Sequence, residues 1–318
     1  MNNPDSSSAR KTSMQTILGA GGVIGLELMR ELSSYTEHIR LVRRNPTPPG
    51  PGMEAVAADL LDARQVANAV RGSDVAYLLA GLPCRTSVWQ TEWPRIMRNV
   101  IDACRRFNAR LVFFDNAYLY GRVSGLMHEE TPVNPCSKKG EVRALIADML
   151  MREFRKGNIS GLIARSSEFY GPGATNSFVH PLVFELLRDG KKAVWLANDQ
   201  VPHSMTYTPD IGRALAMLGN SSFACGQVWH MPTSATPPTG SQFIEQVASA
   251  FRVKARHRVI SRRILNLAGL FNSAAREWTE MLYQYEEPYL FDSSKFDAQF
   301  SKATPYADGI LDTARNAC

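Results

Sequence analysis

Three glycines spaced three residues apart are the first feature of this chain with an evident chemical use. Gly19, Gly22 and Gly25 stand between a short apolar run and a stretch with helical periodicity. In such a turn the first glycine permits the reversal, the second lets the backbone approach a pyrophosphate, and the third lets the helix lie against a sheet. The amides at the helix start, including those of Val23 and Ile24, then face the anion. The spacing predicts a turn that binds a dinucleotide.

Two arginines follow at the position that selects between the two nicotinamide dinucleotides. Arg43 and Arg44 end the second apolar run, and Arg43 lies 24 residues after Gly19 (43 − 19 = 24). An acidic side chain at this place would bond the ribose 2′-hydroxyl of NAD, whereas arginine suits the 2′-phosphate of NADP. The pair therefore favours NADP(H) over NAD(H).

Short apolar runs alternate with helix-patterned stretches through the first half of the chain. We expect strands over residues 16–18, 39–42, 54–58, 75–79, 111–114 and 161–164, and helices over residues 23–33, 63–70, 93–107 and 139–155. This alternation predicts an α/β fold, a doubly wound parallel sheet of the Rossmann type whose ligand crevice lies at the carboxyl ends of the strands. Further helices are expected over residues 177–188 and 242–251.

Three regions follow from this pattern. Residues 1–13 form a polar leader that we expect to be disordered, and residues 14–170 form the dinucleotide-binding domain. Residues 171–318, where the alternation loosens, form mainly a smaller substrate lobe that is interleaved with the sheet, because some of its segments return to it.

The composition is that of an ordinary soluble protein and excludes several functional classes. The 318 residues are 44% hydrophobic and 21% charged, with no apolar stretch of about 18 residues to span a bilayer. Five scattered cysteines without metal-ligand spacing indicate a reducing, cytoplasmic setting and no metal site. Six basic residues in segment 252–263 alternate with apolar ones, which argues against a nucleic-acid site. We expect a small-molecule substrate and no nucleic-acid or membrane partner; a homodimer remains open.

Several further segments of the chain, taken together with the glycine turn, match the order of motifs in a known protein family. After the glycine turn come Asp59-Leu60, the segment 74–81 that ends in Ala80-Gly81, the segment 111–121, the arginine-to-Tyr-Gly-Pro-Gly segment 163–173, and segment 205–214. In this order they resemble an extended short-chain dehydrogenase/reductase of the NAD(P)-dependent epimerase/dehydratase type. The resemblance implies that Asp59 and Leu60 approach the adenine and that Ala80 and Gly81 pass the cofactor.

The proton relay of that family is altered in this chain. The family uses a serine after the fifth strand, then a tyrosine and a lysine four residues apart on the next helix. Asn116 fills the serine position, whereas Lys139 and Arg143 fill the positions of the tyrosine and lysine. The resemblance therefore implies hydride transfer between nicotinamide and a carbonyl or alcohol carbon, with a non-standard proton relay.

Several interpretations of this altered relay remain open. In the first, Lys139 is the acid and base, its pKa lowered by Arg143 and by burial, while Arg143 holds the ribose and Asn116 donates to a carbonyl oxygen. In the second, the relay has moved to Tyr118, Tyr120 or a carboxyl group, Asp115 or Glu141.

The remaining interpretations set redox catalysis aside. The chain would then be a non-catalytic NADP(H) sensor or scaffold, or a lyase or isomerase without net redox chemistry on the same fold. Two polar residues of the later segments are further candidates: Glu168 for contact with the nicotinamide side of the cleft, and His203 for contact with the substrate.

Overall fold

A seven-stranded parallel sheet forms the centre of the protein. The computed structural model describes residues 13–46, 50 and 52–317, so almost all of the expected leader lies outside the described residues. The strand order is β11-β7-β5-β4-β1-β2-β3, and each neighbouring pair is parallel. The strands are β1 Met14–Leu18, β2 His38–Arg43, β3 Met53–Ala57, β4 Val75–Leu78, β5 Arg110–Asn116, β7 Gly161–Ser166 and β11 Val228–His230. The predicted doubly wound sheet is confirmed.

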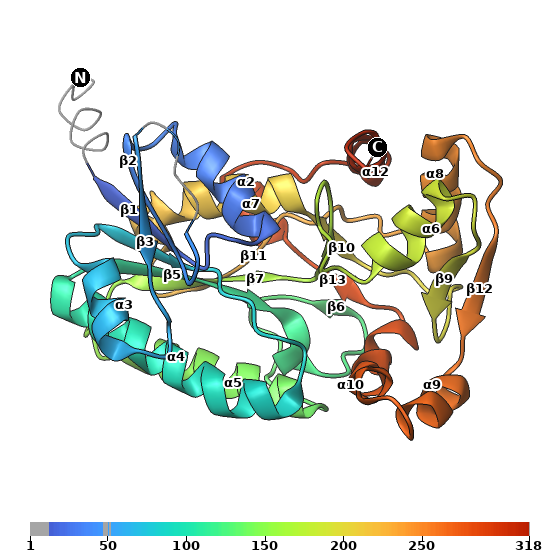
Figure 1. Ribbon diagram of the computed structural model, residues 1–318, viewed down its shortest axis with the longest axis horizontal. Coiled ribbons are helices and arrows are strands. Elements are labelled where there is room, and N and C mark those ends of the chain that lie inside the picture. The colour runs from blue at the N-terminus through green and yellow to red at the C-terminus, as the bar shows by residue number, and fades with distance from the viewer. Residues whose placement is uncertain (1–12, 47–49, 51, 318) are drawn as a thin grey trace.

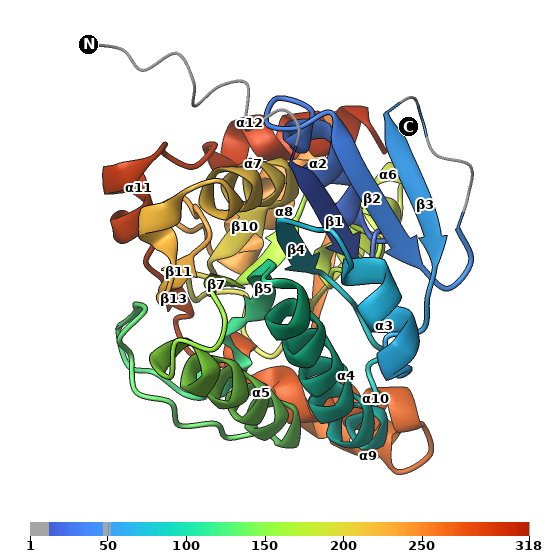
Figure 2. The same cartoon turned by 90° about the vertical axis from the view of Figure 1, so that its left-hand side faces the viewer.

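Helices cover both faces of this sheet (Figure 2). One face carries α2 Val23–Leu32 and α7 Thr208–Gly219; the other carries α3 Ala63–Val70, α4 Thr86–Phe107 and α5 Lys138–Arg155. Strand β4, in the centre of the sheet, is therefore apolar throughout rather than alternating, and all four of its residues are buried. Helices α2 and α7 pack so closely that a Cβ on Gly212 would lie 2.6 Å from the Glu27 backbone.

Two elements differ from the sequence prediction in this half of the molecule. Helix α4 begins at Thr86, whereas the prediction began it at residue 93. Pro94 is typical of a first helical turn, but here the helix accommodates it in its interior. Strand β11 was not predicted, because its three residues are too few to show a period.

The later part of the chain adds a lobe with its own core (Figure 1). Aromatic side chains such as Tyr170, Trp195 and Phe243 fill that core. Three short parallel pairs belong to the connections: β8 Glu168–Tyr170 with β10 Met205–Tyr207, β9 Ala193–Leu196 with β12 His257–Ile260, and β6 Leu126–Met127 with β13 Leu290–Phe291. The division of the chain after residue 170 stays a prediction.

The helices of this lobe are mostly short. They are α6 Glu185–Arg188, α8 Gly240–Phe251, α9 Arg262–Gly269, α10 Ser273–Met281, α11 Ser294–Gln299 and α12 Tyr306–Arg315. Single turns occur at Ala117–Tyr120, Ser222–Ala224 and Leu282–Tyr285. The helix predicted over residues 177–188 is a π-helical turn, His180–Phe184, followed by α6.

Candidate functional site

The glycine turn joins β1 to α2 at the carboxyl edge of the sheet. Gly19 has φ +96°, and a Cβ on it would lie 2.7 Å from the backbone N and Cα of Ala80 at the end of β4. A Cβ on Gly25 would lie 3.1 Å from Ala20 Cα, so the helix packs directly against the turn. By contrast, no heavy atom lies within 4 Å of a Cβ built on Gly22. The turn is tightly enclosed at its first and third glycines and open at the second.

The start of α2 suits an anion at this open position. Gly22 is the N-cap residue, no side chain caps the helix, and its first turn contains no acidic residue. The first amides of a helix, here those of Val23 and Ile24, have no partner within the helix. A phosphate group placed at Gly22 would therefore meet backbone N–H donors and the positive end of the helix dipole.

The predicted adenosine-side residues lie around the same edge. The Arg43 side chain crosses the turn, with Cδ and Nη1 each 3.7 Å from a Cβ built on Gly21. Arg44 is exposed beside it. Asp59 and Leu60 follow β3; the Asp59 carboxylate accepts the amide of Leu61 at 2.9 Å.

The residues after β4 complete this edge. Ala80 is half-buried and Gly81 is exposed, and Ala80 backs the glycine turn as described above. The residues predicted to contact the cofactor thus come from the ends of four adjacent parallel strands, β4, β1, β2 and β3, and the loops that follow them. They fit a dinucleotide, because the edge offers an open glycine, an uncapped helix start and a guanidinium without a salt bridge among the described residues.

Asn116 and Tyr118 follow β5 on the same edge. The Asn116 side-chain oxygen accepts the amide of Tyr118 at 3.2 Å, and its amide nitrogen has no hydrogen-bond partner among the residues that the structure describes. The Tyr118 ring stacks on Trp89, with centroids 6.2 Å apart and planes 15° apart. Burial, and then the Glu168 carboxylate, raise the pKa of Tyr118 above its ordinary value. Tyr118 is therefore a neutral phenol at physiological pH.

Behind this site, the buried carboxylate of Asp115 binds the guanidinium groups of Arg143 and Arg165. The guanidinium of Arg143 donates to Asp115 Oδ1 at 2.6 Å, and Nη2 of Arg165 donates to Oδ2 at 3.2 Å. All three side chains are at most 4% exposed. Arg143 also lies over the Trp93 ring, 4.6 Å from its centroid. Arg143 is thus held by Asp115 and by an indole face, and its contact with the cofactor ribose stays a prediction.

Tyr120 belongs to this group as well. Its hydroxyl accepts a hydrogen bond from Arg165 at 2.7 Å and lies 2.8 Å from His230 Nε2. Both contacts are buried, and together they tie the segment after β5 to β7 and β11. The environment of Tyr120 is that of a packing residue.

Lys139 lies in the first turn of α5, fully buried, between two carboxylates of α10. Its Nζ donates to Glu280 Oε2 at 2.7 Å and to Glu277 Oε2. Thr86, at the start of α4, donates its hydroxyl to the same two carboxylates at 2.8 and 3.0 Å. The cluster joins three helices that are distant in sequence.

These carboxylates reverse the expected pKa shift of the lysine. Burial lowers the pKa of Lys139, but the hydrogen bonds to Glu277 and Glu280 raise it more, so the pKa lies above the ordinary 10.5. The sequence-based expectation of a lowered pKa is therefore wrong. Its physical reason is that Arg143, the expected cause, is neutralised by Asp115, whereas the nearest charges to Lys139 are negative.

Comparison with known proteins identifies the family. The sequence profile of the NAD dependent epimerase/dehydratase family matches residues 16–222, more than half of the chain. The chain belongs to this family. It is thus a member of the extended short-chain dehydrogenase/reductases, and the predicted resemblance and the prediction of a nicotinamide-dependent enzyme are confirmed at the level of the family.

Individual relatives of this family are distant in sequence. An uncharacterized UDP-glucose epimerase of Bacillus subtilis is 24% identical over 229 residues, which cover 64% of this chain and 72% of that protein. A 3β-hydroxysteroid dehydrogenase/decarboxylase of Arabidopsis thaliana is 22% identical over 61% of this chain, but the match spans only 37% of its length. The structure of MoeE5 with UDP-glucose and NAD superposes with a TM-score of 0.77 at 19% identity, covering 96% of this chain and 98% of that one.

The structure brings together two groups of polar residues near the site that the sequence analysis did not predict to be in contact. Glu277 and Glu280 are three residues apart on one helix, and this spacing was the only sign that both face one partner. The second group centres on Glu168, whose Oε2 accepts the Tyr285 hydroxyl and lies 3.3 Å from His203 Nε2. The His203 ring is stacked between two tyrosines, 4.6 Å from Tyr285 and 5.0 Å from Tyr289.

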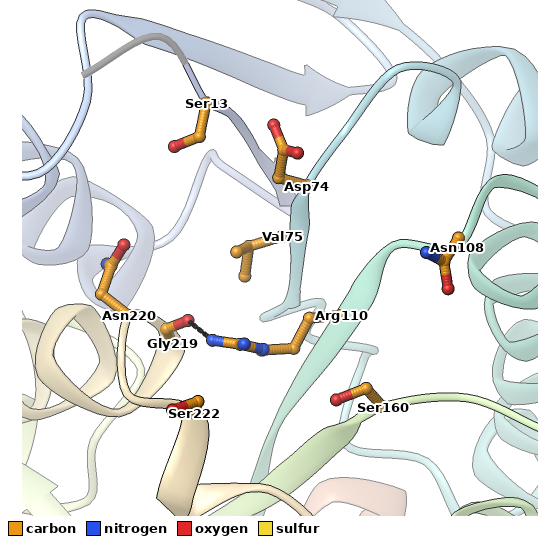
Figure 3. Close-up of a pocket in the computed structure, with 9 residues that line it drawn as sticks. All are labelled: Ser13, Asp74, Val75, Asn108, Arg110, Ser160, Gly219, Asn220 and Ser222. Carbon is orange, nitrogen blue, oxygen red and sulfur yellow. Dashed lines mark hydrogen bonds between the residues drawn. The ribbon is translucent and has the colours of Figure 1, made fainter. Parts of the chain in front are cut away.

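A hollow of about 490 Å³ lies at the opposite edge of the sheet (Figure 3). Residues at the amino ends of the strands line it, among them Asp74, Arg110 and Ser160. Arg110 points across it and donates to the Gly219 carbonyl at 2.7 Å. In open parallel sheets ligands bind at the carboxyl ends of the strands, so this hollow is not the cofactor site.

Proposed function

We propose that this protein binds NADP(H) on the β1–α2 turn and transfers hydride between it and a carbonyl or alcohol carbon of a small molecule. The observation that carries the proposal is the turn itself: an open Gly22 before an uncapped helix, with Arg43 lying across it. When bound, the cofactor supplies the hydride, and the protein supplies orientation and the proton. The cytoplasmic location expected from the cysteines is part of the proposal.

The substrate class is proposed from the relatives. UDP-glucose, which appears in the MoeE5 complex and in the name of the Bacillus subtilis relative, makes sugar nucleotides the first class to test. Hydroxysteroids come second, since the Arabidopsis thaliana relative is named for one. Small phenolic ketones are the third class that suits hydride transfer.

Replacing Arg43 tests the cofactor preference. We expect Arg43→Ala to weaken NADPH binding about tenfold, because the charge-assisted contact to the 2′-phosphate is lost, and to leave NADH binding nearly unchanged. Arg44→Ala is the matched control; its side chain is exposed, so a smaller effect is expected. Calorimetric titration measures both affinities. An unaltered NADPH affinity in Arg43→Ala would overturn the preference for NADP(H).

For the proton we propose Lys139 as a general acid in the direction of carbonyl reduction. Its raised pKa keeps the ammonium protonated at neutral pH, and after donation the amine regains a proton from solvent, while the ionised carboxylates of Glu277 and Glu280 favour the ammonium form. The unpartnered amide nitrogen of Asn116 donates to the same carbonyl oxygen. The neutral phenol of Tyr118 is the competing donor.

Replacing Lys139 separates this relay from its alternatives. We expect Lys139→Met to lower kcat about 100-fold or more, as loss of a general acid does, while NADPH affinity is retained. The control is Lys138→Met on the neighbouring exposed residue. A general acid works only while it is protonated, and the pKa of Lys139 is raised above its ordinary 10.5. The kcat of the wild type for carbonyl reduction should therefore not fall through deprotonation of Lys139 until the pH exceeds that value. Equal turnover of Lys139→Met and wild type, with loss in Tyr118→Phe, would assign the relay to Tyr118.

A second function, that of a non-catalytic NADP(H) sensor, is favoured by one observation. Both cations at the positions of the family's tyrosine and lysine are held by carboxylates, Lys139 by Glu277 and Glu280 and Arg143 by Asp115. A sensor would bind NADPH and turn over none of the three substrate classes. Turnover without net oxidation of added cofactor would instead indicate an epimerase, lyase or isomerase.

A further inference from the structure

Helix α9 and the two residues after it carry an apolar face that the protein leaves uncovered. Ile264, Leu267 and Phe271 are 57%, 63% and 89% exposed, and their spacing of three and four residues places them on one side of a helix. Leu270, beside them, is 68% exposed. The opposite side, with the buried Leu265, packs on the lobe. Apolar side chains gathered in this way mark a contact surface.

A basic segment leads directly into this face. Residues 252–272 include six lysines and arginines and no acidic residue. Arg262 pairs with Glu286 at 2.5 Å. The other five are exposed and form no salt bridge among the described residues; they are Arg252, Lys254, Arg256, Arg258 and Arg263. Segment 252–272, which we term the α9 surface, thus combines exposed apolar side chains with unneutralised positive charge.

The α9 surface lies at one end of the molecule. Figure 1 shows β12 running down the outer edge of the lobe into α9, on the side away from the N-terminus. Strand β12 is an edge strand that pairs with β9 alone. Helix α10, which holds Lys139 through Glu277 and Glu280, packs against α9.

We propose that the α9 surface docks this protein on an anionic lipid bilayer. The apolar side chains enter the boundary of headgroups and acyl chains, while the arginines and lysine attract the anionic headgroups. A second copy bound about a twofold axis would bring the same positive charges together. A nucleic acid would match the charge but leave the apolar face uncovered. Charge and apolarity together fit a bilayer.

This docking is peripheral. None of the helices in the described part of the chain is long and apolar enough to cross a membrane. The sequence-based expectation of no membrane partner rested on the lack of a spanning segment. A helix that lies in the interface needs only one apolar face and flanking basic residues.

Vesicle co-sedimentation with the full-length protein tests the proposal. The vesicles are phosphatidylcholine, with or without a third of phosphatidylserine, at physiological and at high salt. We expect binding to the anionic vesicles that weakens with salt, and a loss of about tenfold or more in Leu267→Glu/Phe271→Glu. Because both residues are exposed, the variant should fold, which circular dichroism checks. Leu26→Glu, at an exposed leucine on α2, is the matched control and should bind like the wild type.

A second variant tests the charge separately. Arg258→Ala/Arg263→Ala removes two exposed cations and should weaken binding to anionic vesicles about 30-fold, at roughly 1 kcal/mol for each basic residue. Three outcomes would overturn the proposal: wild type that does not bind anionic vesicles, equal binding to neutral ones, or α9 variants that bind as the wild type does. A wild-type dimer that Leu267→Glu/Phe271→Glu converts to monomer, without vesicle binding, would make the face a subunit interface instead.

Discussion

Asp115→Asn is expected to destabilise the folded protein by about 3–5 kcal/mol, the cost of removing one partner from a buried ion pair. Asp115 is 2% exposed and accepts hydrogen bonds from two buried guanidiniums, those of Arg143 and Arg165. A neutral amide cannot offset either charge, and its nitrogen would face donors. Urea unfolding measured by circular dichroism gives the difference in the free energy of unfolding.

An exposed pair of the same residue types provides the control for this prediction. Asp102 accepts from Arg105 at 3.2 Å on α4, with both side chains more than half exposed. Asp102→Asn should change stability by less than about 0.5 kcal/mol, since solvent screens such pairs. If the two variants unfold at the same urea concentration, the buried carboxylate does not hold the two arginines in the way described above.

Gly19→Ala is expected to cost about 2 kcal/mol or more of stability. The residue has φ +96°, where a Cβ is strained, and the added atom would lie 2.7 Å from backbone atoms of Ala80. Neither β1 nor β4 can retreat, because both are central strands of the sheet. Thermal unfolding in the absence of cofactor measures this effect.

Gly22→Ala is the matched variant on the same turn. Gly22 has φ −93° and ψ 165°, values open to any residue, and a Cβ there would meet no heavy atom within 4 Å. The free energy of unfolding should therefore fall by less than about 1 kcal/mol, the cost of alanine at an N-cap. Similar losses of stability in Gly19→Ala and Gly22→Ala would contradict the geometry of the turn.

The sheet was predictable because its signals are local. Each of the six predicted strands is a short apolar run, and burial on both faces makes such runs continuous in β4 and β7. The seventh strand, Val228–His230, carries too few residues for such a signal. The start of α4 was predicted seven residues too late, because Pro94 was taken to mark the first turn of the helix. Whether a proline lies in the first turn or inside a helix depends on tertiary packing, and the neighbouring residues in sequence do not indicate it.

The candidate site was predictable only in part, because its charges come from distant segments. The spacing of Lys139 and Arg143 suggested that one cation would lower the pKa of the other. In the folded protein each cation instead has its own carboxylates. Those of Lys139 lie 138 and 141 residues further along the chain. Nothing near Lys139 in sequence indicates this contact, so the direction of its pKa shift required the tertiary structure.

Calorimetric titration of NADPH into wild type and Gly22→Ala tests the central claim most directly. If the pyrophosphate lies on the open glycine, a Cβ there occupies its place, and the affinity should fall at least about tenfold while the fold is retained. The wild type should bind one NADPH per chain. Equal affinities in the two proteins, or no binding by the wild type, would contradict the assignment of the β1–α2 turn as the cofactor site.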